Sequence, residues 1–83
     1  MPSYTYILQS KANQRFYYGS TQDLDQRLKA HNSGKVRSTK AHRPWAVYYV
    51  EEFETKSEAF KREQFFKSIE GYNWLRDTGI IKK

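Results

Sequence analysis

Alternation between side chains is the first pattern along the chain. In the stretch "SYTYILQS", residues 3–10, Tyr6 falls on one side of an extended backbone and Thr5 on the other, and the period of two continues around them. That period predicts a β-strand. A second aromatic run, "RFYYGS" at 15–20, also predicts a strand, and the polar residues 11–14 between the runs predict a hairpin turn.

The middle of the chain predicts a helix, a basic loop and a third strand. We expect the second strand to end at Gly19 and a helix to follow over residues 20–34, which begin with capping residues and end with "NSG". Residues 33–44 then form a basic loop closed by Pro44. The stretch "WAVYYVEEF", residues 45–53, has the β-branched and aromatic residues of a strand.

The last third of the chain predicts two helices. Thr55 and Glu58 have the spacing of a capping box, which predicts a helix that starts there and ends near Lys67. Gly71 interrupts this pattern, and a short final helix ends at Gly79. The order ββαβαα indicates an α+β domain with a small mixed or antiparallel sheet.

Length and composition restrict the class of protein. The chain has 83 residues, which fits one domain, and no cysteine, which excludes disulfides and thiolate metal sites. The N-terminus lacks the pattern of a signal peptide, and no stretch reaches the roughly 20 apolar residues of a membrane span. We therefore expect a single soluble domain over residues 1–83, located in the cytoplasm and without membrane contact.

The net charge comes from one segment of the chain. Fifteen Lys and Arg against nine Asp and Glu give a formal net charge of +6, and residues 26–50 contain six of the basic residues and no acid. A patch of one sign indicates a polyanionic partner, most often nucleic acid. The alternative is a solvated basic surface without a partner. The candidate nucleic-acid-binding residues are Lys35, Arg37, Lys40 and Arg43.

The first helix carries polar groups where core residues are expected. Arg27 and His31 share a stripe with Leu24 and Leu28 by helical spacing. Taken singly, Arg27 is explained by a snorkelling side chain and His31 by the dipole at the helix C-terminus. Together, on the face that should meet the sheet, they make an anion or phosphate site a competing interpretation.

The second helix carries a carboxylate in a similar position. Glu63 falls inside the apolar arc formed by Ala59, Phe60 and Phe66. A carboxylate there is costly unless it is paired or binds a metal. One explanation is an ion pair with Arg27 or another basic residue. The other is a ligand for a hard cation such as Mg²⁺, which takes one or two carboxylates together with water and substrate phosphate.

Tyrosines complete the candidate site. Tyr4 and Tyr6 share one face of the first strand, whereas Tyr17 and Tyr18 point to opposite faces of the second. Packing alone would explain any one of them. Tyrosine, histidine, arginine and glutamate side chains that face one another would, however, supply the proton-accepting, phosphate-binding and metal-binding groups that phosphodiester hydrolysis needs.

These residues, in this order, resemble the GIY-YIG nuclease superfamily and in particular its small stand-alone members. The stretch "YTY" at 4–6 is similar to the first motif of the family, and "YYG" at 17–19 to the second. The resemblance covers roughly residues 4–68, and the ordered set is more specific than either motif alone. It implies a three-stranded antiparallel sheet flanked by helices, and a single divalent metal, Mg²⁺ or Mn²⁺.

Carried over residue by residue, the resemblance implies a catalytic site made of Tyr6, Tyr17, Arg27, His31 and Glu63. Glu63 would bind the metal, and Arg27 would stabilise the charge that develops on the phosphate. Tyr17 or His31 would accept the proton of the attacking water, directly or through a relay. Tyr6 would position groups by hydrogen bonding.

The sequence also departs from the family pattern. Tyr4 and Thr5 replace the glycine and isoleucine of the first motif, and Tyr18 replaces the isoleucine of the second. Ser20 stands where some relatives have a lysine. Asn73 is the nearest candidate for an asparagine that family members often use to hold the site.

The main functional hypothesis is a small metal-dependent endonuclease or related phosphodiesterase. Its substrate would be DNA, with RNA as the less favoured alternative, and its sequence specificity would be low, since a separate DNA-binding domain has no room here. Trp45 or Trp74 would stack on unpaired bases. The alternative is a nucleic-acid-binding module with the nuclease fold and little or no turnover, working with a partner protein. A third hypothesis is a structural domain whose polar cluster is an internal ion-pair network.

Overall fold

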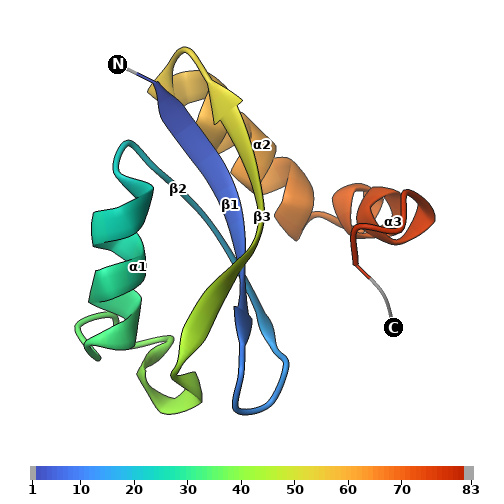
Figure 1. The fold of residues 1–83 in the computed structure, drawn as a ribbon. Helices are drawn as coiled ribbons and strands as arrows, with labels where there is room; N and C mark the ends of the chain where they lie inside the picture. The colour runs from blue at the N-terminus through green and yellow to red at the C-terminus, as the bar shows by residue number, and fades with distance from the viewer. Residues whose placement is uncertain (1, 82–83) are drawn as a thin grey trace.

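Three antiparallel strands form the centre of the fold, with one helix on one side of the sheet and two on the other (Figure 1). The computed structural model describes residues 2–81. The strands pair in the order β2-β1-β3, which confirms the expected α+β class, the element order and the antiparallel sheet. The elements are β1 (Ser3–Ser10), β2 (Phe16–Thr21), α1 (Leu24–Asn32), the 3₁₀ turn η1 (Lys40–His42), β3 (Trp45–Phe53), α2 (Lys56–Lys67) and α3 (Ile69–Asp77).

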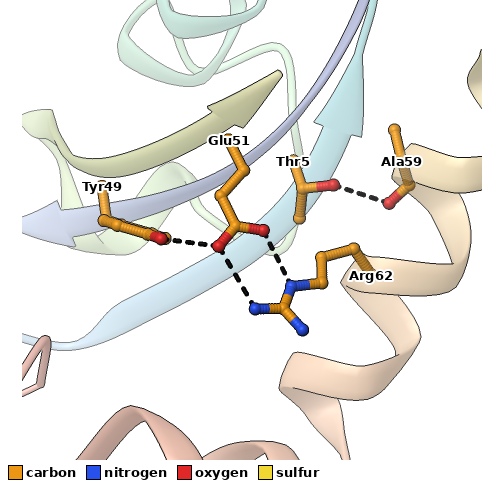
Figure 2. Close-up of polar contacts among 5 residues, drawn as sticks. All are labelled: Thr5, Tyr49, Glu51, Ala59 and Arg62. Atoms are coloured by element: carbon orange, nitrogen blue, oxygen red, sulfur yellow. Dashed lines mark hydrogen bonds and ion pairs between the residues drawn. The ribbon is translucent and has the colours of Figure 1, made fainter. Parts of the chain in front are cut away.

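Successive side chains of the central strand β1 point to opposite faces of the sheet and belong to two separate small cores. Tyr6 belongs to the core under α1, whereas Ile7 packs with Phe66 in the core under α2 and α3. Thr5 lies on the α2 side as well, where its hydroxyl donates to the carbonyl of Ala59 at 2.7 Å (Figure 2). This hydrogen bond ties α2 directly to the middle of the sheet, at a position where the family pattern has a different residue.

A polar network holds β3 against α2 on the side of the sheet away from α1. Nε of Arg62 lies 2.7 Å from Oε1 of Glu51, and the Tyr49 hydroxyl donates to the same carboxylate (Figure 2). Burial, aided by the Glu51 carboxylate, raises the pKa of Tyr49 to about 12, so Tyr49 remains a donor at neutral pH. The Arg62 guanidinium also lies 4.5 Å from the ring centroid of Trp74, which connects α3 to the network.

Two glycines allow close approaches that a side chain would block. Gly19 lies inside β2, and a Cβ there would be 2.4 Å from the Tyr6 hydroxyl. Gly71 lies inside α3, and a Cβ there would be 1.7 Å from the carbonyl oxygen of Phe65. The expectations that Gly19 ends the second strand and that Gly71 interrupts the helical pattern are therefore wrong, because both glycines provide space rather than a chain reversal.

The second helix begins as the sequence predicts but turns one aromatic residue outward. The Thr55 hydroxyl accepts from the backbone N–H of Glu58 and caps α2. Ala59 and Glu63 lie on the face toward the sheet. Phe60, expected in that buried arc, is 54% exposed, because it lies about 100° around the helix from Ala59.

No helix within residues 2–81 has both the length and the apolar character needed to cross a membrane.

Candidate active site

A chain of hydrogen bonds runs beneath α1, from β1 to the loop that follows the helix. The hydroxyl of Tyr6 lies 3.2 Å from Nε2 of His31, and Nδ1 of His31 lies 2.8 Å from Oγ1 of Thr39. Thr39 donates its own hydrogen to the carbonyl of Val36, so its oxygen accepts from Nδ1–H of His31. Nε2 is therefore the unprotonated nitrogen, and it accepts a hydrogen bond from Tyr6.

Burial keeps this pair neutral. The exposed fractions of Tyr6 and His31 are 1% and 0%. Burial raises the pKa of Tyr6, and the neighbouring Arg27 only partly offsets it. Burial also lowers the pKa of His31, and the positive charge of Arg27 adds to that effect. At neutral pH the contact is therefore a phenol donating to an uncharged imidazole.

Arg27 reaches the same phenol from the exposed side of α1. Its interaction with the Tyr6 hydroxyl is the main cause of a raised pKa of Arg27. Because a guanidinium can only donate hydrogen bonds, Arg27 can act only as a donor toward Tyr6. The exposed Arg27 also lines a small pocket of about 200 Å³ that includes Thr21 and Asp23. The buried chain thus ends in a positive charge at the surface.

Tyr17 lies on the same face of the sheet as Tyr6. Its ring centroid is 4.8 Å from the His31 ring, in an edge-on arrangement, and 6.5 Å from the Tyr6 ring. Tyr18 points to the other face, where its ring lies 6.3 Å from that of Phe66. The predicted opposition of the two tyrosines is therefore confirmed, and of the two only Tyr17 is near the polar chain.

Glu63 approaches the site from α2. Its exposed fraction is 9%, its Oε1 accepts from the Ser20 hydroxyl at 2.8 Å, and its Oε2 forms an ion pair with Nζ of Lys67 at 2.7 Å. Burial is the main cause of the raised pKa of Tyr6, and the interaction with Tyr6 is the main cause of the raised pKa of Arg27; the negative charge of Glu63 adds to both. The basic partner of this carboxylate is thus Lys67 rather than Arg27.

The donor set around Glu63 fits an open site for a hard divalent cation. Mg²⁺ accepts one or two carboxylates and fills its remaining positions with water and phosphate oxygens. Residues 2–81 contain no group of three or more His, Cys, Asp or Glu side chains that could enclose a metal. A single carboxylate held in place by Ser20 suits a metal that shares its ligands with substrate, not a closed structural metal site.

Sequence reasoning missed two residues that hold the site together. Ser20 is noticeable in the sequence only as a departure from relatives, although strand alternation places it on the side of the sheet that faces α2 and Glu63. Thr39 is 1% exposed and orients His31, but it lies in an irregular loop where no periodicity predicts a buried position.

The basic loop lies beside the site but does not enter it. The four predicted nucleic-acid-binding side chains are exposed, and none forms an ion pair within the described part of the chain: Lys35, Arg37, Lys40 and Arg43. Nε of Arg43 donates to the carbonyl of Lys40, so this guanidinium also braces the loop. The loop connects to the site through Thr39.

The two tryptophans and Asn73 lie away from the surface of the site. Trp45 is 4% exposed and donates its ring N–H to Thr39, so the expectation that it stacks on bases is wrong. The ring of Trp74 is stacked on that of Phe66, at 6.4 Å and 16°. Asn73 is exposed on α3, which lies across the sheet from α1 (Figure 1).

Comparison with known proteins adds an independent finding. The sequence model of the GIY-YIG catalytic domain matches residues 2–73. A UPF0213 protein of Bacillus pumilus is 47% identical over 66 residues, which cover 78% of this chain and 66% of that protein. The UPF0213 protein YazA of Bacillus subtilis is 42% identical over 65 residues, covering 77% and 65%. These matches thus span slightly less than two thirds of the two Bacillus proteins.

Other relatives match over more of their length. A UPF0213 protein of Listeria welshimeri is 40% identical over 80 residues, which cover 94% of this chain and 84% of that protein. Among solved structures, the solution NMR structure of a UPF0213 protein of Bacillus halodurans has a TM-score of 0.55 and 33% identity, and the match covers 94% of this chain and 85% of that one.

Proposed function

Because the chain belongs to the GIY-YIG family, a family of nucleases, we propose that it is a divalent-metal-dependent endonuclease that hydrolyses phosphodiester bonds in DNA with low sequence specificity. The observation that carries the proposal is the cluster of Tyr6, Tyr17 and His31 beneath the exposed Arg27, on which the negative charge of Glu63 also acts. A cluster serving only as an internal ion-pair network would not need an arginine exposed at its end.

The roles follow from which groups reach the surface. Glu63 would hold the Mg²⁺ or Mn²⁺ ion, which supplies Lewis-acid charge to a phosphate oxygen when bound. Arg27 binds and orients the phosphate and stabilises its developing charge. Tyr6 and His31 are positioning residues, because both are buried. The hydrogen bond between them fixes the Tyr6 hydroxyl, with which Arg27 interacts.

We assign Tyr17 as the proton acceptor at the surface, where it takes the proton of the attacking water while its own hydroxyl proton passes to solvent. His31 has no exposed surface and its Nε2 is already occupied by the Tyr6 hydroxyl, so an attacking water cannot contact it directly. Tyr17 is half-buried, and its ring packs edge-on against His31. Its hydroxyl would therefore meet the water, while His31 keeps the ring in place.

The exposed basic residues of the loop would supply affinity for the phosphate backbone. Such contacts carry no sequence information, which agrees with low specificity, and they make binding salt-dependent. The choice of DNA over RNA, a cytoplasmic location, a partner protein and a single domain over residues 1–83 remain predictions.

A second candidate function is a nucleic-acid-binding module with little or no turnover. The ion pair between Lys67 and Glu63 favours it, because an ammonium group occupies one oxygen of the only carboxylate assigned to the metal. A bound metal would compete with this lysine for the carboxylate.

One experiment separates these functions. The purified protein is incubated with labelled single-stranded, duplex and branched DNA, and with RNA, in the presence of Mg²⁺ or Mn²⁺. Cleavage that is lost in Glu63→Ala and Arg27→Ala supports the endonuclease. Cleavage that survives both substitutions contradicts the assigned site, and salt-sensitive binding without cleavage supports the binding module.

A further inference from the structure

A pocket of about 460 Å³ opens between the sheet and the start of α2. The pocket is formed by the first residue of β1, the end of β2, the turn that leads into α1 and the first turns of α2. Its lining residues that matter here are Ser3, Ser20, Asp23, Lys56 and Phe60. The volume is within the range of small-molecule binding sites. None of the roles assigned above uses this pocket.

Ser3, in the wall of the pocket, has a hydroxyl group without a hydrogen-bond partner among residues 2–81. The exposed fraction of Ser3 is 2%, and its hydroxyl has no hydrogen bond in the structure. Thr5, two residues later on the same face of β1, does bond across to α2. A buried hydroxyl left without a hydrogen bond destabilises the folded state, so its retention supports a partner that binds there.

The pocket is a neighbour of the proposed catalytic site. It shares Thr21 and Asp23 with the smaller pocket lined by Arg27. Ser20 lines it and donates to Glu63. Ala59 also lines it and lies about one turn before Glu63 on the same face of α2, about 6 Å along the helix axis. A nucleotide whose phosphate lies between Arg27 and Glu63 therefore has this pocket beside it.

The chemistry of the lining suits a nucleobase better than a second phosphate. Phe60 offers an aromatic ring that is 54% exposed, on which a base can stack. The charged lining side chains, Asp23 and Lys56, have opposite signs, so the lining has no net charge to attract an anion. The hydroxyls and the Gln22 amide can donate to and accept from the edge of a base.

We propose that this pocket is a subsite for one unpaired nucleobase that adjoins the scissile phosphate, with Phe60 as the stacking platform and Ser3 as an edge contact. This inference rests on the proposed function, because it places the base relative to the phosphate that Arg27 and Glu63 act on. A base in a duplex is stacked on both faces and paired along its Watson–Crick edge, so a base that stacks on Phe60 must belong to an unpaired nucleotide.

The test compares wild type with Phe60→Ala, Phe60→Trp and the control Ile69→Ala, which removes another exposed hydrophobic side chain from outside the pocket. Cleavage rates are measured on a labelled single-stranded DNA in which one abasic residue is moved along the positions around the cleaved bond. We expect one position at which loss of the base slows wild type and Ile69→Ala about tenfold. Phe60→Ala should be slow on the intact strand and insensitive to the abasic residue, whereas Phe60→Trp should behave as wild type.

A binding measurement keeps the inference testable without turnover. Glu63→Gln protein, with and without Phe60→Ala, is titrated with the same strand carrying 2-aminopurine at each position in turn. Fluorescence quenching at one position that depends on Phe60 supports the subsite even if wild type never cleaves, in which case the proposed hydrolysis alone fails. The subsite is overturned if the abasic residue slows Phe60→Ala as much as it slows wild type, or if the quenching of 2-aminopurine does not depend on Phe60. Either result leaves the nuclease proposal intact. Absence of any nucleic-acid binding overturns both.

Ser3→Ala supplies a second readout. We expect it to raise the Tm, because an unpaired buried hydroxyl is removed, and to weaken binding of the intact strand several-fold. A Ser3 with a purely structural role would change the Tm and leave the affinity unchanged, which would remove Ser3 from the subsite.

Discussion

The hydroxyl of Tyr6 donates to Nε2 of His31 across 3.2 Å, and both side chains are buried beneath α1. This contact gives His31 its role in the proposed mechanism. Its basic nitrogen is occupied and has no exposed surface, so His31 orients Tyr6, and Tyr6 interacts in turn with Arg27. The residues that are left to meet water and phosphate are Tyr17 and Arg27.

Single substitutions of the neighbouring tyrosines should have opposite consequences. Tyr17→Phe removes the hydroxyl that we assign to the attacking water, and we expect cleavage to fall about 100-fold or more. Tyr18→Phe changes a residue that packs on the other face of the sheet, so cleavage should stay within about twofold of wild type. Single-turnover rates of the two variants check this, and the reverse ranking would contradict the assignment.

The stability of the protein should depend on pH through His31. Burial lowers the pKa of His31 in the folded state, below its usual value of about 6.5. Below about pH 6.5 the unfolded chain therefore binds a proton on this residue more readily than the folded chain does, and stability is lost as the pH falls. Urea unfolding of wild type and His31→Gln between about pH 7 and 5 measures this difference. Parallel stability curves for the two proteins would contradict it.

Gly19→Ala should disturb the site through Tyr6. The added Cβ would lie 2.4 Å from the Tyr6 hydroxyl, so the ring must move and its contact with His31 must break. We expect a loss of about 1–3 kcal/mol in the free energy of unfolding. Tyr6→Leu is the matched partner, because it removes the clashing ring. The double variant should therefore lose less than the sum of the single variants, and strictly additive losses would show that the two positions are not coupled.

The sequence predicts the elements of this fold better than the contacts between them. The bounds of β1 and β3 follow from alternation and composition, and α2 begins at its predicted capping residue Thr55. The role of Gly19 could not be predicted, because it depends on a ring from the neighbouring strand. The partner of Glu63 depends in the same way on how α2 lies against the sheet, although Lys67 is at the favourable i, i+4 spacing.

The candidate site shows the same division between local and tertiary information. Helical spacing is enough to place Arg27 and His31 on one face. It does not reveal that His31 is closed off from solvent, because Thr39 reaches it from a loop without periodicity. Helical spacing does not predict the exposure of Phe60, because Ala59 and Phe60 lie on neighbouring sides of the helix and only packing against the sheet decides which of them is buried.

Removal of the lysine that pairs with Glu63 should change the metal requirement. Lys67→Gln frees Oε2 of Glu63, so we expect the Mg²⁺ concentration for half-maximal cleavage to fall, by up to about fivefold for a partly exposed pair. Lys61→Gln is the control, because Lys61 is an exposed lysine on the same helix that forms no ion pair within residues 2–81. An unchanged or higher metal requirement in Lys67→Gln would mean that Glu63 does not bind the ion in competition with this lysine.

Single-turnover cleavage of labelled DNA by Glu63→Gln, with and without Mg²⁺, tests the central claim most directly. Glutamine keeps the size of the side chain but removes the charge, and Glu54→Gln provides a control at an exposed glutamate between β3 and α2. We predict that Glu63→Gln cleaves at least about 100-fold more slowly than wild type in Mg²⁺, and that Glu54→Gln matches wild type. Wild-type cleavage by Glu63→Gln under the same conditions would contradict the account.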